Sequence, residues 1–177
     1  SASGGTVLYP NAHFDIVRIG IGLYGYWPSR ESKIQHSLIN KKMLNLKPIL
    51  SWKAKISEIK KLKKGDFVGY DLAERMQEDT TVGMIPIGYW HGFRRALSHK
   101  GQVLVKDIKC KIVGRVSMDL IIIECEKTNA NVGDIVTIIG KDKKEILTAD
   151  DQMNITDAVY TYEILTTINP LIKRVLV

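Results

Sequence analysis

The sequence predicts a mainly β protein, a small antiparallel barrel or sandwich with short helices near its end. Short strand-like runs recur from Ile49 onward, and glycine turns such as Lys64-Gly65-Asp66 and Val132-Gly133-Asp134 separate them. No internal repeat is present. A chain of 177 residues can bury roughly 70% of its unfolded surface, which suffices for one domain and part of a second.

The region before these strands is expected to be largely irregular. Residues 1–12 are small and rich in glycine, which is typical of a loop. Residues 14–19 alternate enough to predict a short strand, which runs straight into the glycine-rich residues 20–25. Residues 28–48 show no clean period, so we expect an exposed connection there.

The glycine-rich run has the spacing G-x-G-x-x-G, which is typical of dinucleotide-binding turns. That fingerprint needs an acidic residue about 20 positions later, yet no Asp or Glu lies between Glu31 and Glu58. Pro28 would also cut the following helix short. A dinucleotide site is therefore excluded. The amides near Gly20 and Ile21 either hold a single phosphate or form an ordinary glycine turn.

From Ile49 onward, alternation predicts a half-buried strand with Trp52, Ala54 and Ile56 facing the core. Its phase slips at Glu58-Ile59, where we expect a bulge. Further strands are predicted over residues 82–87, 102–106, 108–113, 120–125 and 135–139.

Thr148 and Thr156 are expected to be the N-caps of two short helices. In the second helix an apolar stripe recurs at Val159, Tyr162, Leu165 and Ile168, and Asn169-Pro170 ends it. On this pattern alone Tyr162 would be a core residue. Residues 171–177 are expected to close the chain as a strand.

Charge and rare residue types narrow the class of protein. The formal net charge is +7, which suits either solvated turns or an anionic partner such as nucleic acid. Cys110 and Cys125 lie among alternating strand residues, so we expect buried, reduced thiols. The histidines have no metal-binding spacing, and no apolar run approaches the ~18 residues that span a bilayer. We therefore expect a soluble cytoplasmic protein with no metal site.

Residues 67–95 hold the best candidate for chemistry. Two clusters, Val68-Gly69-Tyr70 and Ile87-Gly88-Tyr89, each place a tyrosine at the end of an extended segment. A phenol held there can donate or accept a proton. The alternative is a core tyrosine with a satisfied hydroxyl group, and this stretch by itself favours that alternative.

Six segments, in order and over nearly the whole chain, resemble the C-terminal part of the alanine racemase family, which consists of pyridoxal-phosphate enzymes with an α/β barrel and a β-rich domain. They are HFDIVRIGIGLYGYWPS (13–29), GDFVGYD (65–71), VGMIPIGYWHGFRR (82–95), KIVGRVSMD (111–119), VGDIVTIIG (132–140) and TYEILTTINPLIKRV (161–175). The resemblance implies that residues 1–47 are the tail end of an α/β (TIM-type) barrel with its connection. Residues 48–177 would be an antiparallel β-barrel-like C-terminal domain with short helices.

The resemblance also implies which residues hold the cofactor. Arg18 would face the pyridine nitrogen of pyridoxal phosphate. A guanidinium group there donates a hydrogen bond but no proton, so the ring stays unprotonated. Ser3, the amides of Gly20 and Ile21, and the phenol of Tyr162 would hold the phosphate. The lysine that forms the Schiff base belongs to an N-terminal barrel half that this chain lacks, so we expect the fragment alone to be inactive.

Tyr70 would be the second catalytic base, acting in the site of the opposite subunit of a homodimer. The Met118 amide would take the carboxylate of the substrate alanine, and Tyr89 would narrow the entrance. Two features depart from the family pattern. Asp71 follows Tyr70 where glycine is usual, and Trp90-His91 replaces a small and an acidic residue. A carboxylate beside Tyr70 would oppose its use as a base unless Asp71 points away.

The resemblance predicts interconversion of L- and D-alanine, the latter for peptidoglycan. Three other functions stay open. A serine racemase shares the fold, but it tends to have a smaller polar residue at the position of Tyr162. A basic β-barrel that binds nucleic acid fits the net charge and the aromatic residues. A degenerate relative kept only for interaction is the third.

Overall fold

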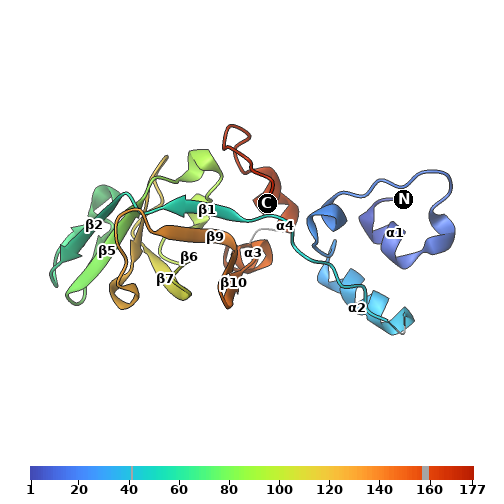
Figure 1. Cartoon of the computed structure of the whole chain (residues 1–177), viewed down its shortest axis with the longest axis horizontal. Helices are drawn as coiled ribbons and strands as arrows, with labels where there is room; N and C mark the ends of the chain where they lie inside the picture. The colour runs from blue at the N-terminus through green and yellow to red at the C-terminus, as the bar shows by residue number, and fades with distance from the viewer. Residues whose placement is uncertain (41, 157–159) are drawn as a thin grey trace. The chain divides into compact units, whose positions relative to one another are not determined.

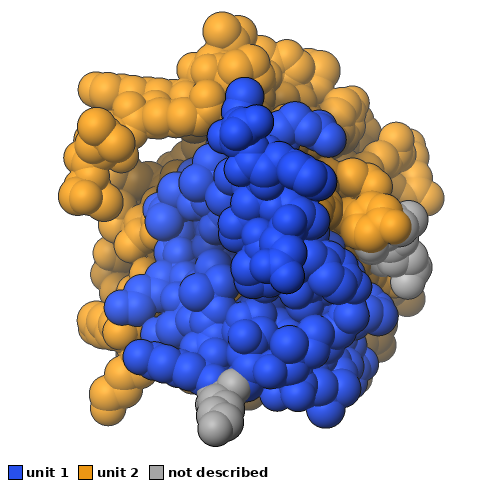
Figure 2. Space-filling view, turned by 90° about the vertical axis from the view of Figure 1, so that its right-hand side faces the viewer, with its two compact units in different colours: residues 1–50 blue, residues 51–177 orange. Residues whose placement is uncertain are grey.

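The computed structural model describes residues 1–40, 42–156 and 160–177. It divides into two compact units, residues 1–50 and residues 51–177 (Figure 2). Short helices make up the described part of the first unit, whereas the described strands all lie in the second. Across the described ranges, every helix is too short or too polar to reach across a bilayer.

The first unit contains helices α1 (Ser3–Leu8) and α2 (Arg30–Ile39) and the 3-10 turns η1 (Pro10–Ala12) and η2 (Ile21–Tyr24). The strand predicted over residues 14–19 is wrong, because only an isolated parallel bridge joins Ala2 to Arg18. Alternation in the sequence produces a strand only where a neighbouring strand can pair with it, and no ladder forms among the described residues of this unit.

The irregular connection predicted over residues 28–48 is also wrong, because α2 lies within it. Ser29 is the N-cap of α2, and its Oγ accepts a hydrogen bond of 3.1 Å from the Ser32 amide. Glu31 adds a negative charge in the first turn. These capping interactions stabilise the helix start even though the apolar periodicity is poor.

The second unit is built on one eight-stranded antiparallel sheet (Figure 1). Its strands are β1 (Trp52–Lys55), β2 (Glu58–Leu62), β5 (Thr80–Ile85), β6 (Gln102–Val105), β7 (Ile108–Val113), β8 (Ile121–Glu124), β9 (Ile135–Asp142) and β10 (Glu145–Leu147). Their order is β1-β9-β6-β7-β8-β5-β2, and β10 pairs with β9 outside this path.

The two ends of this order are joined by the chain itself. The Ile56 amide donates to the Asp134 carbonyl oxygen at 3.0 Å, and the Ser57 amide donates to the Met84 carbonyl oxygen at 2.8 Å. One extended segment therefore pairs first with β9 and then with β5. This link closes the sheet into a barrel-like domain, so the mainly β prediction is confirmed.

The strands predicted between Ile49 and Ile139 are confirmed with small shifts of their ends. The bulge expected at Glu58-Ile59 is wrong, because the phase slips where the chain changes partner from β9 to β5. The register instead shifts between Trp52 and Lys53. Three strands were not predicted, because they are too short to show an alternation of apolar and polar residues: β10 and the two-residue strands β3 (Phe67–Val68) and β4 (Glu74–Arg75).

The buried core of the second unit is mainly apolar on both faces of its strands. Ten of its apolar residues have no measurable exposure to solvent: Ile85, Phe93, Val103, Leu104, Val105, Ile112, Ile123, Val136, Ile138 and Ile139. Cys110 and Cys125 are buried free thiols, as predicted. Burial, which disfavours the thiolate, raises the pKa of Cys110 to about 12.

The first predicted helix cap near the end of the chain is confirmed. Helix α3 (Ala149–Thr156) follows Thr148, whose Oγ1 accepts from the Asp151 amide at 3.2 Å. The Asp151 carboxylate in turn accepts from the Thr148 amide at 2.7 Å. This reciprocal pair is the reason why the helix begins there.

The second predicted cap is wrong, because Thr156 is the last residue of α3. Helix α4 (Thr161–Thr166) begins after Tyr160. Of the expected stripe, Leu165 and Ile168 are buried and Val159 lies outside the described residues. Tyr162 is 36% exposed, so the core role is also wrong. Residues 171–177 form no strand, and most of their side chains are exposed.

Candidate active site

Tyr70 is presented by a short hairpin of β3 and β4, in which Val68 pairs with Glu74. Val68 and Met76 pack with Val113 in a small buried cluster, so the base of the hairpin is anchored on β7. The loop between the two strands leaves Tyr70 68% exposed. The alternative of a buried core tyrosine therefore does not hold.

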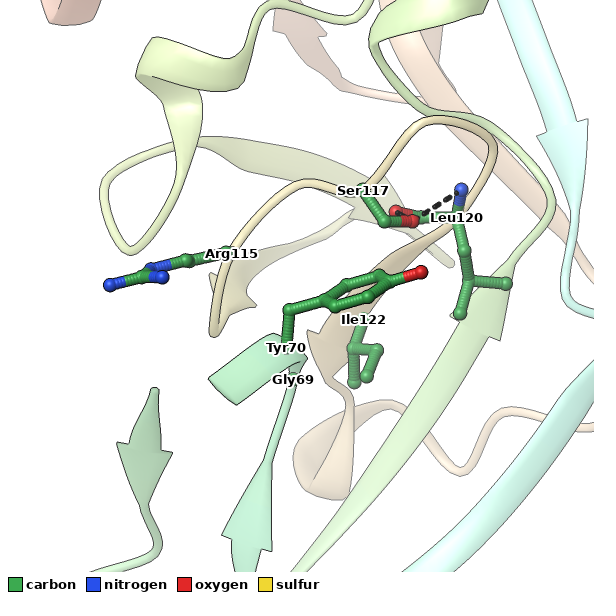
Figure 3. A pocket seen from close by; sticks show the side chains of 6 residues that line it. All are labelled: Gly69, Tyr70, Arg115, Ser117, Leu120 and Ile122. Carbon is green, nitrogen blue, oxygen red and sulfur yellow. Dashed lines mark hydrogen bonds between the residues drawn. The ribbon is translucent and has the colours of Figure 1, made fainter. Parts of the chain in front are cut away.

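Tyr70 lines a cavity of about 300 Å³. The other lining residues are Gly69, Arg115, Ser117, Leu120 and Ile122 (Figure 3). The phenol ring extends into this cavity, and within the described part of the chain its hydroxyl group has no hydrogen-bond partner. An open phenol on an apolar-walled cavity is suited to transfer a proton to or from a small ligand.

The carboxylate of Asp71, the residue after Tyr70, is paired with an arginine. Its Oδ2 accepts a hydrogen bond of 2.7 Å from Nη1 of Arg115, which lines the same cavity. The two opposite charges offset each other beside Tyr70. The backbone of Asp71 is left-handed, with φ 58°. Because glycine adopts this conformation most readily, and aspartate more readily than most residues, the backbone conformation is compatible with either residue after Tyr70.

Met118 lies in the turn from Ser117 to Leu120, next to the cavity. The Ser117 Oγ accepts from the Leu120 amide at 3.0 Å and donates to the Leu120 carbonyl oxygen at 2.8 Å, which fixes the turn. Met118 is 53% exposed, and its amide makes no hydrogen bond with the described residues. That amide is therefore available to an acceptor such as a carboxylate.

Tyr89 is held directly against this turn. Its amide donates to the Ser117 carbonyl oxygen at 3.0 Å, and the Trp90 amide donates to the Met118 carbonyl oxygen at 2.9 Å. A Cβ on Gly88 would lie 2.3 Å from the Ser117 carbonyl oxygen, so only glycine allows the two segments to approach. The departure at Trp90-His91 has a local role, because His91 Nδ1 accepts from the Gly88 amide at 3.1 Å.

In the first unit the structure brings together the residues expected to hold the cofactor. The Gly20 amide donates to the Ser3 Oγ at 2.9 Å, which leaves the hydroxyl proton of Ser3 free for another acceptor. Ile21 begins η2 directly after Gly20. Arg18 pairs with Ala2 through the parallel bridge, and its exposed guanidinium group has no partner among the described residues.

Tyr162 lies in the second unit, on α4. Its pKa is raised, chiefly by burial and then by the neighbouring Tyr160, whose ring lies edge-on at 5.8 Å. The phenol therefore stays protonated and can act as a hydrogen-bond donor. An ion pair of 2.7 Å between Arg94 and Glu163 joins α4 to the segment that follows Tyr89.

Sequence reasoning missed Arg115, Ser117 and Glu74 as parts of this site. Arg115 is a lone charge in the run Val113 to Val116, between residues that become buried, and that contrast could have marked it. Glu74 lies in a strand too short to be predicted. Within the described residues, no group of three or more His, Cys, Asp or Glu side chains could hold a metal ion.

The fold and the site together define an antiparallel β domain that presents an exposed tyrosine on a cavity, as in an enzyme domain. Residues 49–176 match the family described as alanine racemase, C-terminal domain, and the chain belongs to it. The alanine racemase of Leptospira interrogans is 42% identical over 177 residues, which is 99% of this chain and 45% of that enzyme. The alanine racemase of Carboxydothermus hydrogenoformans is 36% identical over 169 residues, which is 95% of this chain and 44% of that enzyme.

Solved structures agree with this assignment. The crystal structure of alanine racemase from Bacillus anthracis with bound L-Ala-P has a TM-score of 0.85 and 32% identity, over 96% of this chain and 42% of that one. The alanine racemase from E. faecalis has a TM-score of 0.83 and 30% identity, over 96% and 43% of the two chains. The chain therefore spans less than half the length of the relatives it matches.

Proposed function

We propose that this chain is the C-terminal portion of an alanine racemase that interconverts L- and D-alanine, the latter for peptidoglycan. The observation that carries the proposal is Tyr70, an exposed phenol with a free hydroxyl group on a cavity next to the Met118 turn. Family membership supports the reaction class. In this proposal residues 1–47 are the tail end of an α/β barrel, residues 48–177 are the C-terminal β domain, and the enzyme is cytoplasmic.

Racemisation removes the α-proton from one face of the substrate and returns a proton to the other face, so two bases must flank the α-carbon. Tyr70 is the base on one side. The base on the other side is a lysine from the N-terminal barrel half, which these 177 residues do not include. Tyr70 serves the site of the opposite subunit, so the active form is a homodimer. The Met118 amide receives the substrate carboxylate, and Tyr89 narrows the entrance.

The donor groups of the first unit fit pyridoxal 5'-phosphate. The Ser3 hydroxyl group has a free proton, and a Cβ built on Gly20 would meet nothing within 4 Å, so an anion can approach the backbone there. The Ile21 amide and the Tyr162 phenol would be further phosphate ligands, as would the Gly20 amide in exchange for its present hydrogen bond to the Ser3 Oγ, and Arg18 would face the pyridine nitrogen. When bound, pyridoxal phosphate supplies the electron withdrawal that makes the α-proton removable.

Ion pairs between lysines and carboxylates argue against the alternative of a barrel that binds nucleic acid. Lys60 pairs with Glu58 at 3.1 Å, Lys63 with Asp79 at 2.8 Å and Lys106 with Asp134 at 2.9 Å, so part of the positive charge is already compensated. A serine racemase is disfavoured by the large Tyr162. Comparison of kcat/KM for alanine and serine in the complete enzyme separates these two substrates.

The test is Tyr70→Phe in the complete enzyme. General acid–base catalysis contributes ~10²–10⁴-fold, so we expect kcat/KM to fall at least about 100-fold in both directions. Tyr160→Phe is the matched control, because it removes a phenol of the same unit that does not line the cavity and keeps the ring contact. Interconversion of both enantiomers at the original rate by Tyr70→Phe would overturn the proposal.

A further inference from the structure

The Glu74 carboxylate joins two segments of the chain that lie far from it in sequence. Its Oε2 accepts a hydrogen bond of 2.5 Å from the Gly114 amide. The same oxygen lies 2.7 Å from His99 Nδ1, which must carry the proton because a carboxylate only accepts. The His99 amide donates to the Gly114 carbonyl oxygen at 3.2 Å, so the three residues form a closed set of contacts.

These contacts adjoin two of the residues that line the cavity, Gly69 and Arg115. Gly114 precedes Arg115, and a Cβ on Gly114 would lie 3.3 Å from the Cα of Gly69, the residue before Tyr70. The Asp71–Arg115 ion pair joins the same two segments a second time. The Tyr70 loop is therefore fastened to the Gly114–Arg115 segment at two points, and Glu74 is one of them.

We infer that Glu74 is a positioning residue, which holds the Tyr70 loop and the Gly114–Arg115 segment in one fixed relation to the substrate cavity. The inference rests on the proposed function, because it concerns the placement of the proposed base. Hydrogen bonds to an ionised carboxylate are roughly twice as strong as neutral ones, so one side chain can fix both segments. Misplacement of a reacting group by ~1 Å can cost about 10²-fold in rate.

Buried apolar contacts support the hairpin in addition to Glu74. Val68 and Met76 anchor it on Val113 through buried apolar contacts, whereas the side chain of Glu74 is 25% exposed at the edge of this cluster. Removal of the carboxylate should therefore leave the barrel intact and loosen only the loop that carries Tyr70. Glu78 is exposed and has no partner among the described residues, which makes it the matched control.

The first experiment compares Glu74→Ala, Glu74→Gln and Glu78→Ala in the complete pyridoxal-phosphate-loaded enzyme. We expect Glu74→Ala to lower kcat about 10- to 100-fold with a smaller change in KM. Glu74→Gln keeps one acceptor for the Gly114 amide, so it should lie between Glu74→Ala and the unchanged enzyme. Glu78→Ala should match the unchanged enzyme. Unchanged kcat in Glu74→Ala, or Glu74→Gln as impaired as Glu74→Ala, would overturn the inference.

The second experiment separates an effect through Tyr70 from a general loss of structure. If Glu74 acts through Tyr70, then Glu74→Ala should cost nothing further when it is added to Tyr70→Phe. Additive losses in this double-mutant cycle would mean that Glu74 acts elsewhere, and the inference would fail. The α-deuterium isotope effect on kcat/KM should rise in Glu74→Ala only for the enantiomer whose proton the tyrosine removes. An equal rise of the isotope effect for both enantiomers would also contradict the positioning role of Glu74.

Failure of this inference is distinguishable from failure of the proposed function. Full activity of Tyr70→Phe would overturn the function itself, and with it the role of Glu74. Loss of activity in Tyr70→Phe together with full activity in Glu74→Ala would overturn only the positioning role. Thermal unfolding of each variant, with Glu78→Ala as reference, shows whether the barrel is intact. A large loss of stability in both Glu74 variants would assign Glu74 to folding and would overturn the inference.

Discussion

Arg115 Nη1 lies 2.7 Å from the Oδ2 of Asp71, the residue that follows Tyr70, and Arg115 also lines the cavity that the Tyr70 ring enters. Asp71 reaches its partner from a left-handed backbone conformation with φ 58°. The pair is exposed, so it contributes only about 0–1 kcal/mol to stability. The backbone conformation, more than the charge, therefore decides which residues are tolerated after Tyr70.

Asp71→Gly should leave the free energy of unfolding within ~1 kcal/mol of the original, because glycine adopts φ 58° freely and only an exposed ion pair is lost. Asp71→Val should cost about 1–2 kcal/mol more than Asp71→Gly, because a left-handed conformation is unfavourable for residues with a Cβ. Urea unfolding of the two variants measures the difference. Equal stability of Asp71→Gly and Asp71→Val would contradict the backbone explanation.

Gly88→Ala should destabilise the domain by about 1–3 kcal/mol or more, because the new methyl group cannot be placed without moving backbone. It would lie 2.3 Å from the Ser117 carbonyl oxygen and 2.5 Å from the Asp119 amide nitrogen. The Met118 turn would have to move, so KM for alanine in the complete enzyme should rise as well. Denaturant unfolding and steady-state kinetics measure the two effects.

Gly83→Ala is the control for this prediction. A Cβ on Gly83 would meet side-chain atoms no closer than 3.5 Å, which is ordinary contact distance. The same substitution should therefore have a much smaller effect there. A Gly83 variant as unstable as the Gly88 variant would show that alanine is costly anywhere near these strands and that the Met118 turn is not specifically affected.

The strands of the barrel were predictable from the sequence because their apolar residues either alternate with polar ones, as in Ile108–Val113, or follow one another almost continuously, as in Ile135–Asp142. Alternation failed at residues 14–19, where no neighbouring strand forms a ladder. Periodicity failed for α2, whose capping by Ser29 is a side-chain effect. Short-range patterns therefore predict elements well only where tertiary pairing is available to complete them.

The site was predictable only in part. The sequence pattern marked Tyr70 as a candidate for proton transfer, but its role as the second base and the role of the Met118 amide came only from resemblance to a family, because nothing in the side chains marks a backbone role or an open cavity. The partners of Glu74 and Arg115 could not be predicted, since Gly114 and Asp71 are separated from them by 40 and 44 residues. Such pairs depend on how the folded hairpin packs against Val113 of β7, which a linear pattern does not contain.

The buried thiol of Cys110 predicts a loss of stability at alkaline pH. Burial raises its pKa from 9.0 to about 12 in the folded chain. Above pH 9 the unfolded chain therefore loses this proton while the folded chain retains it, and the unfolding free energy falls as pH rises toward 12. The slope from one such group is at most ~1.4 kcal/mol per pH unit. Urea unfolding at about pH 8 and about pH 10.5 measures the fall.

Cys110→Ala separates this effect from other alkaline titrations. The substitution creates a small cavity at every pH, but it removes the ionisable group. The fall in stability between the two pH values should therefore be smaller in Cys110→Ala than in the original chain. An identical fall in both proteins would show that the Cys110 thiol does not contribute.

The isolated chain of 177 residues should not racemise alanine even when pyridoxal phosphate is added, because the proposed second base is outside it. Detection of D-alanine from L-alanine with a coupled oxidase measures this. Activity should appear only when the N-terminal half of the enzyme is present. Turnover by the purified chain alone would contradict the two-base assignment to Tyr70 and a lysine elsewhere.

Tyr162→Phe should weaken the binding of pyridoxal phosphate to the complete enzyme. Burial raises the pKa of Tyr162, so the phenol keeps its proton and can donate it to a phosphate oxygen. A hydrogen bond to a charged group is worth ~1.5–3 kcal/mol, so the dissociation constant should rise about 10- to 150-fold. Cofactor absorbance during titration measures this change.

Tyr160→Phe keeps the edge-on ring contact and loses only its own hydroxyl group, so it should bind the cofactor normally. Equal binding by both variants would remove Tyr162 from the phosphate site.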